Sequence, residues 1–287
     1  MKKNLSPRIL LCVIATLLVV ASGCAAGSQA KTKSPKRMLV VTVTKGFRHS
    51  SIPTAEKILG ELAQTSRAFT VDYVRTDAEM AEKMSVAALK NYDGVIFANT
   101  TGDLPLPDRQ GFLDWIKSGK AFVGMHSAAD TFDKTAKSEG YPPFVDMIGG
   151  EFKTHGPQVE VDAINQDRGF PACRHLTPNW KVFDEIYQFN SFHRAKIHGL
   201  LTLDQHPNDK TPGDYPVAWC KEYGQGRVFY TSLGHREDMW DPNWIDPKTG
   251  ERKNSKQIAI DYQGHILGGI LWAVGLEKGD ARPQTTK

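Results

Sequence analysis

Several histidines of this chain directly follow apolar runs that are typical of buried strands. His126 lies in the stretch KAFVGMHSAAD, where residues 121–123 form such a run and small residues follow on both sides of the imidazole. Small neighbours would let the chain reverse sharply and leave the tip residue exposed above the sheet, as in a nucleophile elbow. An imidazole at such a tip suits a metal ligand or a proton shuttle better than a covalent acyl carrier. A histidine that merely caps the next helix would leave the same pattern.

Two further loops after predicted strands carry a histidine, His49 in GFRHSSIP and His235 in LGHRE. The carboxyl ends of strands in an open sheet meet at one edge, so we expect these histidines to lie at the same rim as His126. His155, in GGEFKTHGP, stands beside glycines that would let the backbone approach a ligand closely. A solvated loop residue is the alternative interpretation of His155.

The elements that must position these histidines alternate along the first half of the chain. Buried strands are expected at residues 38–44, 69–75, 93–98 and 121–123. They are separated by a helix that begins at Pro53 and by helices at residues 85–89 and 107–117. This alternation predicts a parallel sheet with right-handed crossovers. The second half predicts a short helix at 144–148, strands at 158–164, 197–203, 216–221 and 227–233, and a closing helix at 256–274. The last two strands are joined by a glycine-rich hairpin turn. We therefore predict an α/β sandwich with an antiparallel extension.

The segments GFRHSSIP, GMHSA, GGEFKTHGP and VFYTSLGH, in this order, resemble those of the ThuA-like (trehalose utilisation) family over about residues 38–273. That family is similar to the class I glutamine amidotransferases, so the resemblance implies a flavodoxin-like three-layer sandwich. His126 takes the place of the elbow cysteine, and without a thiolate nucleophile glutamine amidotransferase activity is not expected. The resemblance implies carbohydrate metabolism, in the company of sugar dehydrogenases that make 3-keto-glycosides, and no nucleotide cofactor. It leaves hydrolysis, elimination and isomerisation of a glycoside or 3-keto-glycoside open.

Three hypotheses fit these residues. In the first, His126, His155 and His235 hold a zinc-type divalent metal with one open position. Glu151 or Glu185 then acts as general base or as a hydrogen-bond partner of a metal ligand. In the second, His126 and His235 act as general acid and base without a metal, tuned by Glu185. In the third, the protein is a non-enzymatic lipoprotein that binds sugars.

Residues near the predicted rim offer the contacts that a sugar needs. Aromatic rings could stack on its apolar face, although each one alone is more often core packing. Polar and charged groups could bind its hydroxyls. The predicted substrate-binding residues are Phe47, Tyr187 and Trp240, together with Arg48, His49, Ser127, Asp130, Arg236 and Glu237.

The N-terminus predicts export. Basic residues precede an apolar run at 9–21, and the sequence Ala-Ser-Gly-Cys then ends at Cys24. This pattern resembles a lipobox, which predicts a lipoprotein signal peptide at 1–23 and lipid attachment at Cys24. Residues 24–37 predict a flexible tether, and 38–287 the folded domain. We expect the protein to be anchored in the cell envelope by its lipid alone, with cleavage and release as the alternative.

Charge and cysteine content restrict the partners further. The net charge is +4, but seven basic residues fall in the signal peptide and tether, which leaves 29 basic residues against 32 acidic ones in the domain. No basic patch therefore argues for nucleic acid. Cys173 and Cys220 could pair in an exported protein or remain buried thiols, and the sequence leaves both possibilities open.

Overall fold

The computed structural model describes residue 1 and residues 34–133 and 139–284. The predicted signal peptide, Cys24 and most of the tether lie outside the described residues and stay predictions. The described residues from 35 to 284 form a compact unit. Its first strand begins at Lys36, so the last two residues of the predicted tether belong to that strand. Within the described residues, no helix has both the length and the apolar character needed to cross a membrane.

A nine-stranded sheet runs through this unit in the order β2-β1-β3-β4-β11-β10-β9-β6-β7. Its first five strands pair in parallel. They are β1 (Lys36–Val41), β2 (Phe69–Val74), β3 (Gly94–Ala98), β4 (Ala121–Met125) and β11 (Gly226–Thr231). This arrangement is the flavodoxin-like strand order with β11 in the fifth position. Every residue of β3 and β4 is buried, as expected for strands that are covered on both faces.

The remaining four strands extend the sheet in antiparallel fashion. They are β10 (Pro212–Tyr223), β9 (His198–Gln205), β6 (Val159–Asn165) and β7 (Asn179–Asp184). β10 and β11 are joined by a tight turn in which Gly224 has a φ of 65°, as the glycine-rich sequence predicts. A separate two-stranded sheet of β5 (Glu151–His155) and β8 (Tyr187–Asn190) carries His155.

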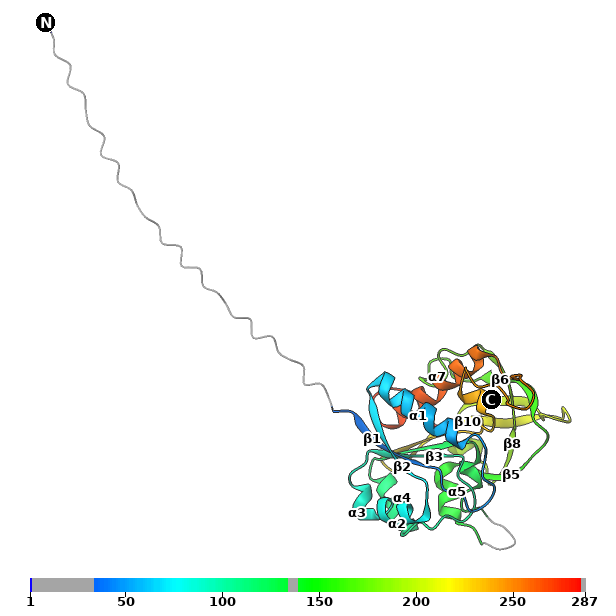
Figure 1. The fold of residues 1–287 in the computed structure, drawn as a ribbon, viewed down its shortest axis with the longest axis horizontal. Helices are drawn as coiled ribbons and strands as arrows, with labels where there is room; N and C mark the ends of the chain where they lie inside the picture. The colour runs from blue at the N-terminus through cyan, green and yellow to red at the C-terminus, as the bar shows by residue number, and fades with distance from the viewer. Residues whose placement is uncertain (2–33, 134–138, 285–287) are drawn as a thin grey trace. The chain divides into compact units, whose positions relative to one another are not determined.

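Helices cover both faces of the parallel part (Figure 1). α1 (Ile52–Ser66) and α7 (Lys256–Ala273) pack with the inner face of the extension in one hydrophobic core. The second core contains residues of four shorter helices. These are α2 (Asp77–Lys83), α3 (Val86–Leu89), α4 (Arg109–Lys117) and α5 (Pro142–Ile148). Short helices follow two strands, η1 (His126–Asp130) after β4 and α6 (Glu237–Trp240) after β11, and η2 (Arg194–Lys196) precedes β9.

The predicted fold class, an α/β sandwich with an antiparallel extension, is confirmed. The predicted helices and strands are all present, with ends that differ by a few residues, whereas α2, α6, η2, β5, β7 and β8 were not predicted. Cys173 and Cys220 are both free and buried, so the interpretation as buried thiols holds in this structure.

His265, on α7, makes stability depend on pH. It is fully buried, its Nδ1 donates to the carbonyl of Ala172 at 2.9 Å, and its Nε2 has no hydrogen-bond partner among the described residues. Burial lowers its pKa from 6.5 to about 4. Between these two pH values the unfolded chain binds a proton at His265 that the folded chain does not bind. The free energy of unfolding therefore decreases as the pH falls through this window.

When the pH is lowered from 7 to 5, we expect the free energy of unfolding to fall by about 2 kcal/mol less in His265→Asn than in the parent. Asparagine can donate to the same carbonyl but does not titrate. Urea denaturation of both proteins at the two pH values measures the difference. Equal losses in the two proteins would contradict this assignment.

Candidate functional site

Three strands of the parallel sheet are followed, within three residues, by a residue with a positive φ. The φ angle is 56° at Asn99 after β3, 48° at His126 after β4 and 116° at Gly234 beyond β11. Such angles are uncommon outside glycine, and they turn the chain sharply at the carboxyl edge of the sheet. The predicted reversal at His126 is thus present, although the imidazole is buried at its tip instead of exposed.

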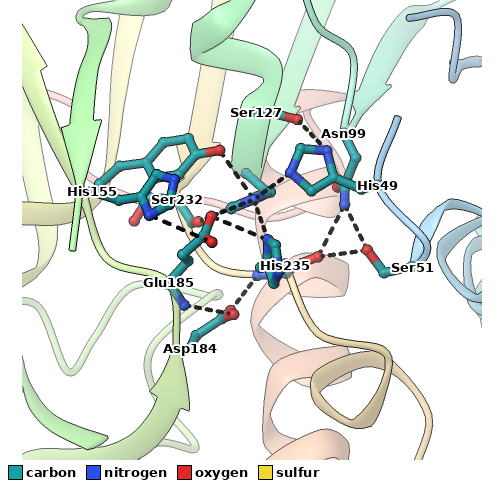
Figure 2. Close-up of polar contacts among 12 residues, drawn as sticks. His49, Ser51, Asn99, Ser127, His155, Asp184, Glu185, Ser232 and His235 are labelled. Carbon is teal, nitrogen blue, oxygen red and sulfur yellow. Dashed lines mark hydrogen bonds and ion pairs between the residues drawn. The ribbon is translucent and has the colours of Figure 1, made fainter. Parts of the chain in front are cut away.

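Four side chains from separate segments meet at this edge. His126 Nε2 lies 3.1 Å from His49 Nε2 and 3.3 Å from His235 Nδ1. Glu185 Oε2 lies 3.1 Å from His235 Nδ1 and 3.7 Å from His126 Nε2. One ligand atom from each of the four lies within 4.8 Å of all the others. Figure 2 shows His49, His235 and Glu185 turned toward a common point. The expected convergence of His49, His126 and His235 is confirmed.

The orientation of the His126 ring is fixed from behind. Its Nδ1 lies 2.8 Å from the carbonyl oxygen of Ser232, which can only accept, so Nδ1 carries the proton. Nε2 therefore presents a lone pair to the cluster, where the Tyr187 hydroxyl approaches it at 3.1 Å. The hydroxyl of Tyr230 donates to the backbone carbonyl of His126 at 2.7 Å and steadies the left-handed turn.

One buried carboxylate connects the segments that carry Glu185 and His235. Asp184 is fully buried at the end of β7, and its two oxygens accept from the backbone N–H of Glu185 at 2.9 Å and of Gly234 at 2.7 Å. The carbonyl of Gly234 accepts from Asn99 at 3.0 Å and from Trp240 at 2.8 Å. The backbone on the N-terminal side of both functional residues is therefore held rigidly.

Burial keeps two of the imidazoles neutral. It lowers the pKa of His126 well below 6.5, helped by repulsion from His49 and His235. It also lowers the pKa of His49 to about 4, with repulsion from His235 next in size. Burial alone would lower the pKa of His235 too, but the hydrogen bond to Glu185 and the charge of Asp184 outweigh it and raise that pKa. The centre therefore contains two neutral imidazoles, and a third imidazole, His235, paired with a carboxylate.

A pocket of about 360 Å³ opens above the cluster. His126 forms no part of its wall because the other residues of the site cover it. The wall combines aromatic and polar side chains, namely Phe47, His49, Asp130, Phe152, His155, Glu185, Tyr187 and His235. Phe47 is 67% exposed, and its ring meets that of His49 in a T-shaped contact, so part of an aromatic ring is open to solvent at the mouth.

Other predicted residues lie at varying distances from this centre. His155 stands outside the four-residue group and contacts it through Glu185, at 3.4 Å. Ser127 supports His49 through a contact of 3.3 Å between Oγ and Nδ1. Glu151 lines a separate hollow with Tyr141 and other residues.

Three predicted substrate-binding residues point away from the pocket. Arg48 donates to the carbonyl of Thr42, and Arg236 bonds to Asp238 and Gln158. The prediction that Trp240 stacks on a sugar is wrong, because α6 turns this side chain fully into the core, where it packs on Tyr262 at 5.1 Å. Glu237 does not line the pocket, and its charge contributes to the raised pKa of His235.

Sequence reasoning missed Asp184 and Phe152. A signal for Asp184 exists, because an acidic residue continues the alternation of buried Trp180 and Val182 and directly precedes Glu185. No comparable signal marks Phe152, whose strand β5 is largely exposed.

The parallel sheet in flavodoxin order, with a histidine at the strand-end turn inside a cluster of three imidazoles and a carboxylate, defines a class of α/β protein without the elbow thiol of the glutamine amidotransferases. The family model for ThuA, described as trehalose utilisation, matches residues 37–247. The chain belongs to the ThuA family.

Solved structures agree with this fold. A ThuA-like protein from Bacteroides uniformis ATCC 8492 is 21% identical, with a TM-score of 0.64 over 86% of this chain and 95% of the other. A ThuA-like protein from Parabacteroides merdae ATCC 43184 is also 21% identical, with a TM-score of 0.61 over 84% and 90%. No protein with a curated description matches the sequence.

Proposed function

We propose that this ThuA-family protein is a carbohydrate-active enzyme that uses a divalent metal to process a glycoside or 3-keto-glycoside in the histidine pocket. The observation that carries the proposal is the meeting of three imidazoles and one carboxylate within 4.8 Å beneath an aromatic-walled pocket. The metal ligands would be His49, His126, Glu185 and His235. This set differs from the sequence-based set of His126, His155 and His235 by including His49 and Glu185 in place of His155.

The four residues fit a metal of the zinc type. Two ligands at ~2.1 Å from one tetrahedral ion are separated by roughly 3.4 Å. Four of the six separations among the ligand atoms, 3.1, 3.1, 3.3 and 3.7 Å, lie near that value, and all six are within 4.8 Å. Ligating imidazoles must be neutral, as the lowered pKa values of His49 and His126 favour. His235, whose pKa is raised by Glu185, would release its proton when the metal binds. His126 Nδ1 donates to a backbone carbonyl, which is a usual hydrogen-bond partner for the second ring nitrogen of a metal-ligating histidine.

The pocket suits a sugar ring beside this centre. A divalent ion held by these four residues could polarise a carbonyl or hydroxyl oxygen of the substrate by taking it as a fifth ligand. The exposed face of Phe47 and the ring of Phe152 offer stacking surfaces, while Asp130 and His155 offer hydrogen bonds to hydroxyls. Export with a lipid anchor at Cys24, and a sugar dehydrogenase that supplies the oxidised sugar, belong to the same proposal.

The test uses the full chain and a panel of glycosides and 3-keto-glycosides. We expect about one divalent metal per chain after dialysis, and turnover that EDTA abolishes and added metal restores. Turnover that prolonged EDTA leaves unchanged would instead establish imidazole acid–base catalysis without a metal. Sugar binding with no turnover of any of these compounds would make the protein a sugar-binding lipoprotein and overturn the proposal.

A further inference from the structure

Asp130 presents a carboxyl group to the same pocket from a rigid element. It is the last residue of η1, which continues β4 directly, and it lines the pocket together with His49, Glu185 and His235. The backbone carbonyl of Asp130 accepts from the N–H of Gly102 at 2.7 Å, which fixes the end of η1 against the loop after β3. The backbone that carries this side chain is therefore fixed between the segments that follow two neighbouring strands.

Asp130 shares its proton with a second carboxyl group. Its side chain is half-buried and hydrogen-bonded to that of Asp133. Burial, followed by the charge and hydrogen bond of Asp133, raises the pKa of Asp130 to about 7. Two carboxylates in contact cannot both stay ionised at low cost, so one of them holds a proton near neutrality. The other charged or titratable groups that interact electrostatically with Asp130 or Asp133 are Asp103, Glu151, Tyr187 and Tyr230.

The other groups of the wall are less suited to donate a proton. His49, Glu185 and His235 belong to the proposed metal centre. Burial raises the pKa of Tyr187 well above 10, which makes its hydroxyl a weak acid near neutrality. The Nδ1 of His155 is directed to the carbonyl of Gly156 at 2.8 Å and to Glu185 at 3.4 Å.

We propose that Asp130 is the general acid of this pocket and protonates the oxygen of the glycosidic bond as that bond breaks. This role rests on the proposed function. The C–O bond breaks with its electron pair going to the leaving oxygen, which takes the proton of the Asp130 carboxyl group. Water then adds to the sugar carbon and returns a proton to the Asp130 carboxylate. The net reaction is hydrolysis, with Asp130 restored and no oxidant or reductant consumed.

The test compares two leaving groups in the full-length, metal-loaded protein. Asp130→Asn should lower kcat for a methyl 3-keto-glucoside by about 100- to 10,000-fold, because a methoxide leaving group needs protonation. The same variant should lose less than about tenfold with the 4-nitrophenyl 3-keto-glucoside, since nitrophenolate departs without a proton. Asp162→Asn is the matched control: Asp162 is exposed on β6 and does not line the pocket, so both activities should stay unchanged.

A readout independent of turnover accompanies these rates. The infrared band of a protonated carboxyl group, present in the parent near neutral pH, should weaken in Asp130→Asn while metal content stays the same. Equal losses on both substrates, or an unchanged infrared band, would overturn the role of Asp130 while leaving the proposed function intact. Failure of the parent to cleave either compound would overturn the proposed function, and the acid role with it.

Discussion

Replacing His126 by asparagine is expected to lower the affinity for a divalent metal by more than about 100-fold, since loss of an outer partner alone costs 10- to 100-fold. The Nε2 of His126 lies within 3.7 Å of a ligand atom from each of the other three residues, so its removal affects the whole set. Asparagine is chosen because it tolerates the left-handed conformation at this position, where φ is 48°. Elemental analysis after dialysis, and competition with a chromophoric chelator, measure the loss.

His155→Asn provides the matched control for this substitution. His155 is part of the sequence-based metal set but contacts the centre only through Glu185, and its side chain is 38% exposed. We expect this variant to keep its metal. Retention of metal by His126→Asn would argue against the centre altogether, whereas loss from both variants would favour the set that includes His155.

Replacing Gly234 by alanine is expected to destabilise the folded protein by about 3–5 kcal/mol, from backbone strain and overpacking together. Gly234 has a φ of 116°, and a Cβ there would lie 2.6 Å from the hydroxyl of Tyr262 and 3.1 Å from the ring of Trp240. Both neighbours are fully buried, and the Tyr262 hydroxyl donates to the carbonyl of Leu233 at 2.8 Å. Little room exists for relaxation, so we expect a lower urea midpoint and a weakened hold on His235.

Gly250→Ala separates backbone strain from crowding. Gly250 also has a positive φ, 73°, but a Cβ there would meet nothing within 4 Å. Its alanine variant should cost only about 1 kcal/mol, the strain of a left-handed alanine. A similar cost at both positions would show that the packing around Gly234 yields more easily than its contacts indicate.

The parallel half of the fold was predictable because its strands are buried on both faces. β3 and β4 appear as uninterrupted apolar runs, and the helices between them carry apolar stripes. The small sheet of β5 and β8 was not, because most residues of its strands are exposed or half-buried and leave no strong periodic pattern. α2 escaped for a related reason, since Met80 is its only buried residue.

The site was predictable in outline but not in its ligands. Loops after parallel strands must meet at one edge, which is why His49, His126 and His235 converge as expected. The direction of each side chain depends on details that the residue pattern does not contain. His155 lies on a largely exposed strand and approaches the Glu185 carboxylate from outside the cluster. α6 turns Trp240 inward, where its indole donates to the carbonyl of Gly234.

Asp184 has a consequence for how the catalytic region forms. Its carboxylate bonds both to the segment after β7, at the far edge of the antiparallel extension, and to the segment after β11, in the parallel sheet. Glu185 and His235 therefore come together only when these two halves of the domain have docked. A ligand held by both residues binds the complete fold and not its parts, so its binding free energy adds to global stability. Thermal unfolding of the whole domain would then report occupancy of the centre directly.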